Sequence, residues 1–577
     1  KLSLNYQYQR QAVDSRTAYQ AESYYVRNLV NQFTQVSGSN LTRALPWAAI
    51  YNDGQELITS HNLRGQANYE ATFHNFSFNA LAGAELRDAQ TDRQGATTYG
   101  IDTENMTTIA VDHVNPFKNV VTGANMFIPY TNNYGGLVSR YVSAYANAAI
   151  SYHAKYTLSA SVRRDASNVF GVATNDLWNP LWSVGAAWLL SAEQWMPEAY
   201  LPYARLRFSY GSSGNSDGKR AAVTTISYNG TSIYTASPYA NFANYANPEL
   251  KWETVNTLNF GADFKWFNNR LTIAVDYYVK KSKDLIENAP IDYTGGIGSQ
   301  MYKNTAQISV RGLDLEISSQ NTVGALKWSS SLFANFYKDR TDAYYQSSQA
   351  AATFVNGSTI VSGVVGMPVY SVYAYKWAGL NPLNGNPRGY VNGEMSEDYA
   401  TITGAKATLA DLAYLGRTSP TLTGALGNSL KWKAISLDFR IGYKFGYYFR
   451  RSSLSYGSLY QTRLGDREYS ERWQQPGDEA KTNVPSAVYP AVGSRDAFYN
   501  FSEATIISGD HIRLQYIGLG YVLSKSKFAK LPFQHITLRA VANNLGLLWL
   551  RNKQGIDPDY PAAIPSKIYS FNLQFSL

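Results

Sequence analysis

The sequence predicts an all-β fold, a transmembrane antiparallel β-barrel with long extracellular loops and short periplasmic turns. Three observations support this prediction. Apolar and polar residues alternate in about 16 segments, nearly all as long as the roughly 9–11 residues that a tilted strand needs to cross a bilayer. The connections between these segments are alternately short and long, as in outer-membrane barrels. No apolar run is long enough for a transmembrane helix.

The composition suits strands and loops that are polar without being charged. Charged residues make up 16% of the chain, against roughly 25% in typical globular proteins. Aromatic residues make up 14% and include 46 Tyr. Cysteine is absent, which excludes disulfides, thiolate metal sites and cysteine nucleophiles. The net charge of +9 comes from scattered Lys and Arg, so we expect no nucleic-acid partner.

The clearest pair of strands lies within residues 254–286 and is joined by a tight turn at Phe267-Asn268-Asn269. We expect its polar face to line a wet interior. The polar face carries Asp263, Lys265, Asp276 and Lys280, and Arg440 and Lys444 belong to the same face of another strand at 435–445. The apolar face of the pair carries Leu258, Phe260, Ala262, Phe264 and Trp266, then Leu271, Ile273, Val275, Tyr277 and Val279.

The remaining strands follow the same pattern, and every second connection between strands is long. Long connections at one end imply that both chain ends lie at the other end of the barrel. The other predicted strands are 1–10, 58–72, 74–88, 138–152, 155–165, 180–191, 203–213, 304–321, 326–340, 421–431, 435–445, 511–523, 535–548 and 567–577. The long connections are 11–57, 89–137, 166–179, 214–250, 287–303, 341–420, 446–510 and 549–566.

The chain ends on the alternating stretch YSFNLQFSL (569–577). Such a strand would be an adhesive edge in water, and in lipid its backbone groups must pair, so we expect it to pair and close the barrel. A terminal strand of a soluble sandwich is the alternative. The residues expected to face lipid are Tyr569, Phe571, Leu573, Phe575 and Leu577, and those expected to face the interior are Ser570, Asn572, Gln574 and Ser576.

Several motifs, in this order along the chain, resemble those of SusC/RagA-type TonB-dependent outer-membrane transporters. They are ESYYVRNLVNQF (22–33), RRDASNVFG (163–171), RLRFSYGSSGN (205–215), the pair of strands beginning NPELKWETVNTLNF (247–286), RWQQPGDEAKTNVP (472–485), DHIRLQYIGLGYVLS (510–524), ANNLGLLW (542–549) and GIDPDYP (555–561). The resemblance extends over nearly the whole chain.

The resemblance implies a barrel of about 22 strands with a plug domain inside it and a TonB-contacting segment before it. Residues 1–577 would then form a partial barrel domain that supplies the last strands. The plug and the first strands would lie outside this sequence, in a longer protein, in a part separated by cleavage, or in a second chain. A TonB complex would act through that plug.

The resemblance also implies a SusD-like surface lipoprotein as partner. The connections 11–57, 341–420 and 446–510 would be the main docking surfaces. Their Tyr-rich stretches TDAYYQSS (341–348) and YSVYAYKW (370–377) contain residues favoured in interfaces and in stacking on sugars. The alternative is that these Tyr pack within the loops or belong to an aromatic girdle.

The expected function is uptake of an oligomeric nutrient, glycan or peptide, across the bacterial outer membrane under a SusD-like lid. A scaffold for an outer-membrane complex is the alternative, and a passive porin is a third hypothesis. We expect no enzyme, metal or cofactor. The six His (61, 74, 113, 153, 511 and 535) lack metal-ligand spacing and are interpreted as solvated loop or girdle residues. NPLNGNPRGYVNGE (381–394) lacks the residue order of a calcium loop.

Overall fold

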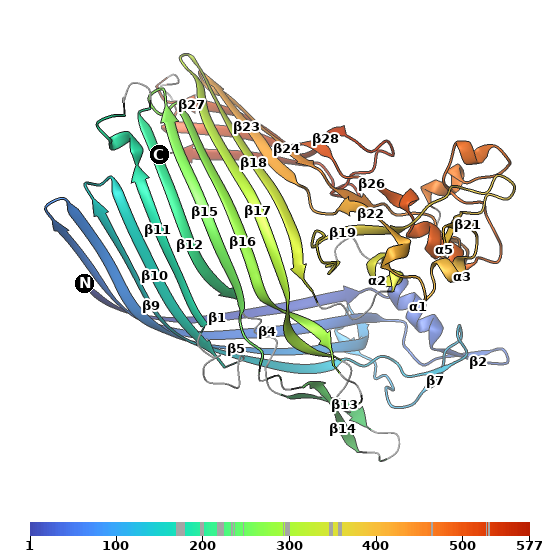
Figure 1. The fold of residues 1–577 in the computed structure, drawn as a ribbon. Coiled ribbons are helices and arrows are strands. Elements are labelled where there is room, and N and C mark those ends of the chain that lie inside the picture. Colours follow the sequence, from blue (N-terminus) through green and yellow to red (C-terminus); the bar gives the residue numbers. More distant parts are fainter. Residues whose placement is uncertain are drawn as a thin grey trace.

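The computed structural model forms one large curved β-sheet with a layer of loops, short helices and small sheets at one end (Figure 1). It describes residues 1–577 except 169–178, 197–200, 216–223, 232–234, 236, 246, 248, 292–293, 295–299, 345–349, 356–360, 463–465, 527, 529–530 and 577. The largest sheet contains 17 strands, of which the two-residue β6 (Thr107–Thr108) only extends the pairing at one end of β5.

The other strands of this sheet pair in chain order, each antiparallel to the next. The predicted fold class is therefore confirmed. The strands are β1 (Leu2–Tyr19), β4 (Ala49–Phe73), β5 (Phe76–Asp102), β9 (Asn132–Tyr152), β10 (Tyr156–Ser167), β11 (Asn179–Leu189), β12 (Tyr203–Asn215), β15 (Glu253–Trp266), β16 (Leu271–Pro290), β17 (Gln300–Val323), β18 (Leu326–Ala343), β23 (Leu422–Trp432), β24 (Ile435–Phe445), β27 (His511–Ser524), β28 (His535–Leu550) and β29 (Ile568–Ser576).

The remaining elements lie in the connections. The helices are α1 (Tyr24–Gln32), α2 (Ala351–Val355), α3 (Tyr399–Ile402), α4 (Tyr456–Thr462) and α5 (Gly493–Asn500). The small strands are β2 (Thr34–Ser37), β3 (Asn40–Arg43), β7 (Phe117–Lys118), β8 (Asn125–Met126), β13 (Thr225–Thr231), β14 (Pro238–Asn244), β19 (Ser371–Tyr375), β20 (Gly389–Val391), β21 (Glu394–Ser396), β22 (Leu412–Arg417), β25 (Tyr448–Arg450) and β26 (Ile506–Ser508). None of the described helices is long and apolar enough to cross a membrane.

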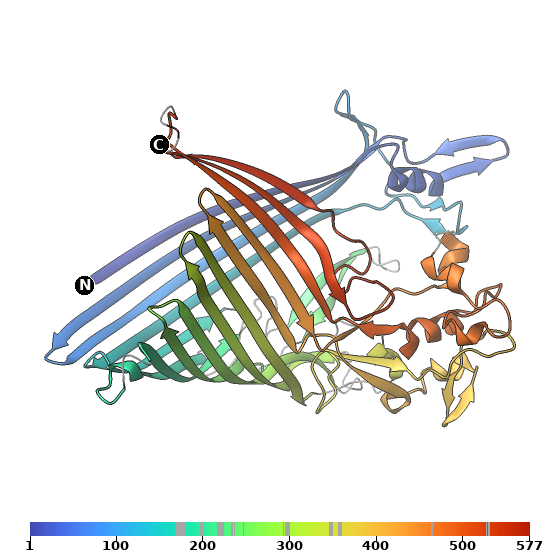
Figure 2. The same ribbon diagram turned by 90° about the horizontal axis from the view of Figure 1, so that it is seen from above.

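Connections at the two ends of the sheet alternate as predicted, but their lengths overlap, because the turn-end connection 190–202 is longer than the loop-end connection 291–299. The helices and small sheets lie at one end of the large sheet, and the two chain ends lie near the other (Figure 1). The turned view in Figure 2 shows the same separation. The sheet therefore has a turn end, with the termini, and a loop end.

The two outermost strands each have one neighbour among the described residues. β29 pairs with β28 and β1 pairs with β4, and no pairing joins β29 to β1 in the described part of the chain. The terminal strand thus pairs as expected, but the expectation that it closes the barrel is not met within these residues.

Several strands near the start of the chain are longer than predicted. β4 has 25 residues and β5 has 27, far beyond the roughly 10 that cross a bilayer. The predicted loop 11–57 is in fact a connection of 20–48, because β1 and β4 stay paired from Leu2↔Ala67 to Tyr19↔Ile50. The strands stay paired beyond the point where their side chains become polar. The alternation of apolar and polar residues ends at that point, so it does not reveal the rest of the strand.

The register divides the side chains between two faces. We define the outer face as the one that carries Phe571 and the inner face as the one that carries Asn572. On the outer face Phe571 lies opposite Ala540, and on the inner face Asn572 lies opposite Arg539. Tyr569, Phe571, Leu573 and Phe575 are all exposed on the outer face, whereas Leu577 lies outside the described residues. Their contact with lipid stays a prediction.

Tyrosines cover glycines on neighbouring strands. The ring of Tyr278 in β16 lies over Gly312 in β17, where an added Cβ would come within 2.2 Å of the ring. An aromatic side chain laid over a strand glycine restores the packing that the glycine lacks. This contact helps to hold the register of the two strands.

Charge on the outer face of β29 tests the lipid prediction. We expect Phe571→Lys to lower the free energy of unfolding from a bilayer by about 2–4 kcal/mol, because a Lys near the mid-plane loses its hydration. The matched variant Asn572→Lys places the same charge on the inner face and should change stability by less than about 1 kcal/mol. Urea unfolding of the full-length protein in lipid vesicles measures both. Equal losses would contradict the assignment.

Candidate functional site

The inner face of the wall carries a cluster of paired charges. Arg207 of β12 donates from Nε to Asp263 of β15 (2.8 Å) and from Nη2 to Asp276 of β16 (3.0 Å). All three side chains are partly exposed. The predicted inner-face residues Asp263 and Asp276 are therefore brought together by Arg207, for which no role was predicted from the sequence.

Gly261 makes room for this cluster. A Cβ at this position would lie 2.7 Å from Cζ of Arg207 and 2.7 Å from Oδ1 of Asp276. A larger residue would push the guanidinium group away from its two carboxylates. At this cluster the inner wall thus presents charges that are paired with one another and fixed in position.

The motif GIDPDYP (555–561) fastens the last long connection to the ends of two strands. Asp559 accepts from Nζ of Lys444 in β24 (2.7 Å) and lies 3.3 Å from Nε2 of His511 in β27. Asp557 accepts from Nη2 of Arg513 in β27 (2.5 Å). Lys444, which was expected to line the interior, ends in this cluster at the loop end of the wall.

Asp559 is held in its ionised form. Burial favours a higher pKa for this carboxyl, but hydrogen bonds from His511 and Lys444 outweigh burial and hold the pKa of Asp559 well below its usual range. His511 is 2% exposed, so its interpretation as a solvated loop or girdle residue is wrong. His61, in contrast, is exposed beside Tyr6 and Tyr8, as a girdle residue would be.

The connections 344–421 and 446–510 fold together into what we call the main loop layer. Their shared apolar core contains Tyr373, Tyr375 and Phe498, and Trp377 stacks on Phe498 with ring centroids 5.9 Å apart. Two Tyr of the stretch YSVYAYKW are therefore core residues and not free to stack on a sugar. Residues 345–348 of TDAYYQSS lie outside the described residues.

Tyr373 is an unusual core residue because its hydroxyl is buried without a hydrogen-bond partner among the described residues. Burial raises the pKa of Tyr373 to about 12. Ionisation of this phenol would place an uncompensated charge in the core. The main loop layer is therefore sensitive to strongly alkaline pH.

Buried ion pairs hold the main loop layer to the wall and to itself. Arg417 donates to Asp339 of β18, and both side chains are buried. Arg451 donates to Glu468, which also accepts from the Tyr499 hydroxyl (3.0 Å). Such pairs are costly to break, because removal of one partner leaves a buried charge alone.

The Asn-rich stretch 381–394 is held by hydrogen bonds to a glutamate. Asn381 donates from Nδ2 to Oε1 of Glu397 (2.6 Å), and Asn386 donates from Nδ2 to Oε2 (2.8 Å). Arg495 of α5 donates in turn to Asn386 (3.0 Å). The Asn side chains of this oxygen-rich turn are therefore used in hydrogen bonds that hold the loop together. No group of three or more His, Asp or Glu in the described residues is arranged to hold a metal.

The connections 20–48 and 103–131 form a second, smaller loop layer. Its core contains Val26, Val30 and Phe33 from the motif ESYYVRNLVNQF. Helix α1 begins at the cap Ser23, whose Oγ accepts from the Val26 backbone (3.3 Å). The helix buries this side and leaves Tyr24 83% exposed.

Exposed apolar side chains mark where the loop layers could meet a partner. Tyr24 belongs to the smaller layer, and Leu383 (83% exposed) and Tyr489 (82% exposed) belong to the main one. All three lie within the predicted docking connections. Sequence reasoning named these connections but not these residues, because exposure depends on which side of each loop packs inwards.

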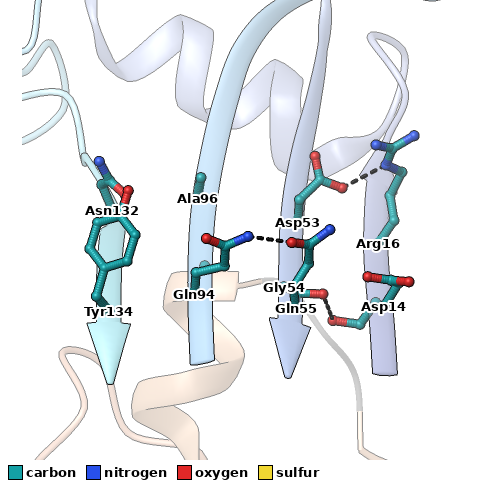
Figure 3. A pocket seen from close by; sticks show the side chains of 11 residues that line it. Asp14, Arg16, Asp53, Gly54, Gln55, Gln94, Ala96, Asn132 and Tyr134 are labelled. Atoms are coloured by element: carbon teal, nitrogen blue, oxygen red, sulfur yellow. Dashed lines mark hydrogen bonds and ion pairs between the residues drawn. The ribbon is translucent and has the colours of Figure 1, made fainter. Parts of the chain in front are cut away.

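A polar pocket of about 600 Å³ lies on β1, β4, β5 and β9 (Figure 3). Arg16 donates to Asp53 (2.6 Å), and Gln94 donates to Gln55. The register places these four side chains on the outer face, in the part of the strands beyond the apolar rows. A pocket on that face does not fit a path through the lumen, so we do not assign the cargo to it.

Comparison with known proteins identifies relatives of this chain. The model of the family described as "TonB dependent receptor-like, beta-barrel" matches residues 1–462. TonB-dependent receptor P26 of Formosa agariphila is 23% identical over 560 residues, which cover 92% of this chain and 52% of that protein. TonB-dependent receptor P3 of the same organism is 25% identical over 77% of this chain and 46% of its own length. The chain thus spans about half the length of these relatives.

TonB-dependent receptor SusC of Bacteroides thetaiotaomicron is similar over a shorter segment, with 23% identity over 38% of this chain and 24% of that protein. Among solved structures, the RagAB peptide importer in its closed-closed state has a similar fold. The TM-score is 0.75 at 20% identity, and the match covers 100% of this chain and 60% of the other.

Removal of a buried cation should loosen the main loop layer. We expect Arg417→Ala to lower the free energy of opening of residues 361–421 by about 3–5 kcal/mol, because Asp339 is left as a buried, unpaired charge. The matched variant Arg467→Ala removes an exposed Arg near Glu471 and should cost less than about 1 kcal/mol. Amide hydrogen exchange measures both, and equal protection in the two variants would contradict this account.

Ionisation of Tyr373 should set the pH above which the main loop layer opens. Its folded pKa of about 12 exceeds the ordinary value, so its contribution to stability is complete below pH ~10 and is lost as the pH rises through ~12. We expect Tyr373→Phe to be neutral or stabilising at pH 7, since it removes an unsatisfied hydroxyl, and to shift loop opening to higher pH. Tyrosinate absorbance at 295 nm follows the titration. An unchanged opening pH would refute the assignment.

Proposed function

The chain belongs to the TonB-dependent receptor-like β-barrel family and is an integral protein of the bacterial outer membrane, and from this premise we propose that it forms most of the wall of a SusC/RagA-type importer. The proposed cargo is an oligomeric nutrient, either a glycan or a peptide. The family is one of receptors and transporters and not a class of enzymes, and the absence of catalysis in this chain is part of the proposal.

One observation carries the proposal: a wall with a charged inner face is capped at one end by loop layers that have cores of their own. A wet inner face fits the passage of a polar cargo. Preformed loop layers fit capture of cargo, or of a partner, on the outside of the cell. RagAB, whose fold is similar, is a peptide importer, which supports a peptide as one of the two cargo classes.

Other protein parts would complete such an importer. The loop end would carry a SusD-like lipoprotein that acts as a lid over the lumen. The exposed Tyr24, Leu383 and Tyr489 are its proposed contacts, because exposed aromatic and large apolar residues are favoured anchors in interfaces. Because the chain spans about half the length of its relatives, the plug and the TonB-contacting segment would come from outside these residues.

A scaffold would differ from an importer in the number of partners that its loops bind. A transporter-like wall that organises other envelope proteins would bind several partners through its loops. A transporter would retain one lipoprotein and move cargo. The identity of the bound chains therefore separates the two.

Purification of the full-length protein from its native membrane in mild detergent, followed by intact mass measurement of every bound chain, tests the proposal. We expect one lipoprotein in a fixed ratio, and energy-dependent uptake of labelled oligosaccharide or oligopeptide by cells that carry the protein. Several envelope proteins in place of one lipoprotein, with no uptake, would favour the scaffold and overturn import.

Variants at the loop end refine this test. We expect Leu383→Asp and Tyr489→Asp each to weaken retention of the lipoprotein by about 1–2 kcal/mol, the usual cost of losing an anchor residue. Phe267→Asp alters another strongly exposed residue (70%), at the turn end, and serves as the matched control. Loss of the partner from all three variants, or from none, would show that these side chains are not the contacts.

A further inference from the structure

A cluster of five basic side chains lies on the outer face of three neighbouring strands. They share the outer face by register: Arg311 of β17 lies opposite Val279 of β16 and Lys338 of β18, and Ser309 lies opposite Lys281 and Arg340. The cluster consists of Lys281, Lys283, Arg311, Lys338 and Arg340, all exposed. We call it the outer basic cluster.

The position of this cluster relative to the apolar part of the wall is defined by the strands themselves. On the outer face of β16 the apolar positions run from Leu271 to Val279. Eight residue steps at ~3.4 Å correspond to roughly 27 Å along the strand, or roughly 20 Å of height at the usual tilt. The outer basic cluster begins in the row of Val279, directly above a row that contains Tyr277 and Phe336. It therefore lies at the loop-end boundary of the apolar face.

The cluster has fewer counter-charges than cations. Among the described residues, Arg340 is paired with Asp342 at 2.8 Å, and no acid forms an ion pair with Lys281, Lys283, Arg311 or Lys338. The nearby Asp284 is paired with Lys251 at 3.1 Å. Four cations thus remain without an acidic partner within this part of the chain.

Two of these cations oppose each other directly. Arg311 and Lys338 are register partners on adjacent strands, and like charges that lie directly opposite destabilise a sheet. An anion between them would turn this repulsion into attraction. The position of the pair at the edge of the apolar face selects an anion that is itself anchored at that depth.

We propose that the outer basic cluster binds anionic, phosphate-bearing lipid headgroups at the outer surface of the membrane. Phosphate oxygens accept hydrogen bonds from Arg and Lys side chains, and basic residues near an anionic lipid surface each strengthen binding by roughly fivefold. The aromatic row below would contact the acyl chains of the same lipids. This surface is separate from the proposed cargo path and partner contacts, and it does not depend on the cargo.

The test compares two double variants of the full-length protein in detergent micelles, titrated with fluorescent diphosphoryl lipid A, phosphatidylglycerol and phosphatidylcholine. Arg311→Gln/Lys338→Gln removes two cations from the outer face. The control Lys280→Gln/Lys327→Gln removes two cations from the inner face of the same sheet, and Lys327 also lies opposite another Lys, Lys431. The two variants have the same net charge.

We expect the parent protein and the control to bind the two anionic lipids in preference to phosphatidylcholine. The outer-face variant should bind them roughly 25-fold more weakly, from about fivefold per residue. Equal affinity of the outer-face variant and the control, or displacement of the lipid by millimolar inorganic phosphate, would overturn the proposal. The second result would indicate a site for free phosphate.

Thermal unfolding is an independent test, because the expected shift in melting temperature has opposite signs in neutral detergent and in anionic lipid. In neutral detergent Lys338→Gln should raise the melting temperature, because it relieves the opposition to Arg311. In phosphatidylglycerol vesicles the same variant should lower it, because a lipid contact is lost. A shift of the same sign in both environments would show that no anionic headgroup occupies the cluster.

Discussion

The demand of lipid for paired backbone groups is the constraint on which this structure depends. A strand in a bilayer has no water to satisfy its N–H and C=O groups, so each must pair with the next strand over its whole length. Continuous pairing fixes the register from β1 to β29, and the register in turn assigns every side chain to one of two faces. The apolar rows, the paired charges of the inner wall and the basic cluster of the outer face all follow from that single assignment.

The loop layers follow a different rule, because they fold in water. There the backbone can leave the sheet, and stability comes from small apolar cores and from buried ion pairs. Tyr373 and Phe498 build one such core, while the Arg417–Asp339 pair joins the layer to β18. Asp559 does the same for the last long connection through Lys444 and His511. These contacts make the loop end a preformed surface that a partner or cargo can meet without a large ordering cost.

Two charged clusters of the wall, one on each face, differ in how their charges are balanced. On the inner face Arg207 is neutralised by Asp263 and Asp276 within the same chain. On the outer face four cations of β16–β18 have no acidic ion-pair partner in the described part of the chain. The Arg207 cluster is therefore balanced within the chain, whereas four cations of the outer basic cluster have no acid partner in the described residues.

The sequence by itself determined the fold class, the end strand and the connections that form the loop end. It did so because the alternation of apolar and polar residues along a strand is a local property that can be read from neighbouring residues. It did not show that β1, β4 and β5 continue far past the apolar rows, since polar strands lose that pattern while keeping their pairing. The partners of Arg207, the burial of His511 and of Tyr373, and the opposition of Arg311 to Lys338 were decided only by the tertiary structure. Each depends on which residues distant in the chain become neighbours across the sheet or within a loop core, and that depends on register and packing, which no local pattern encodes.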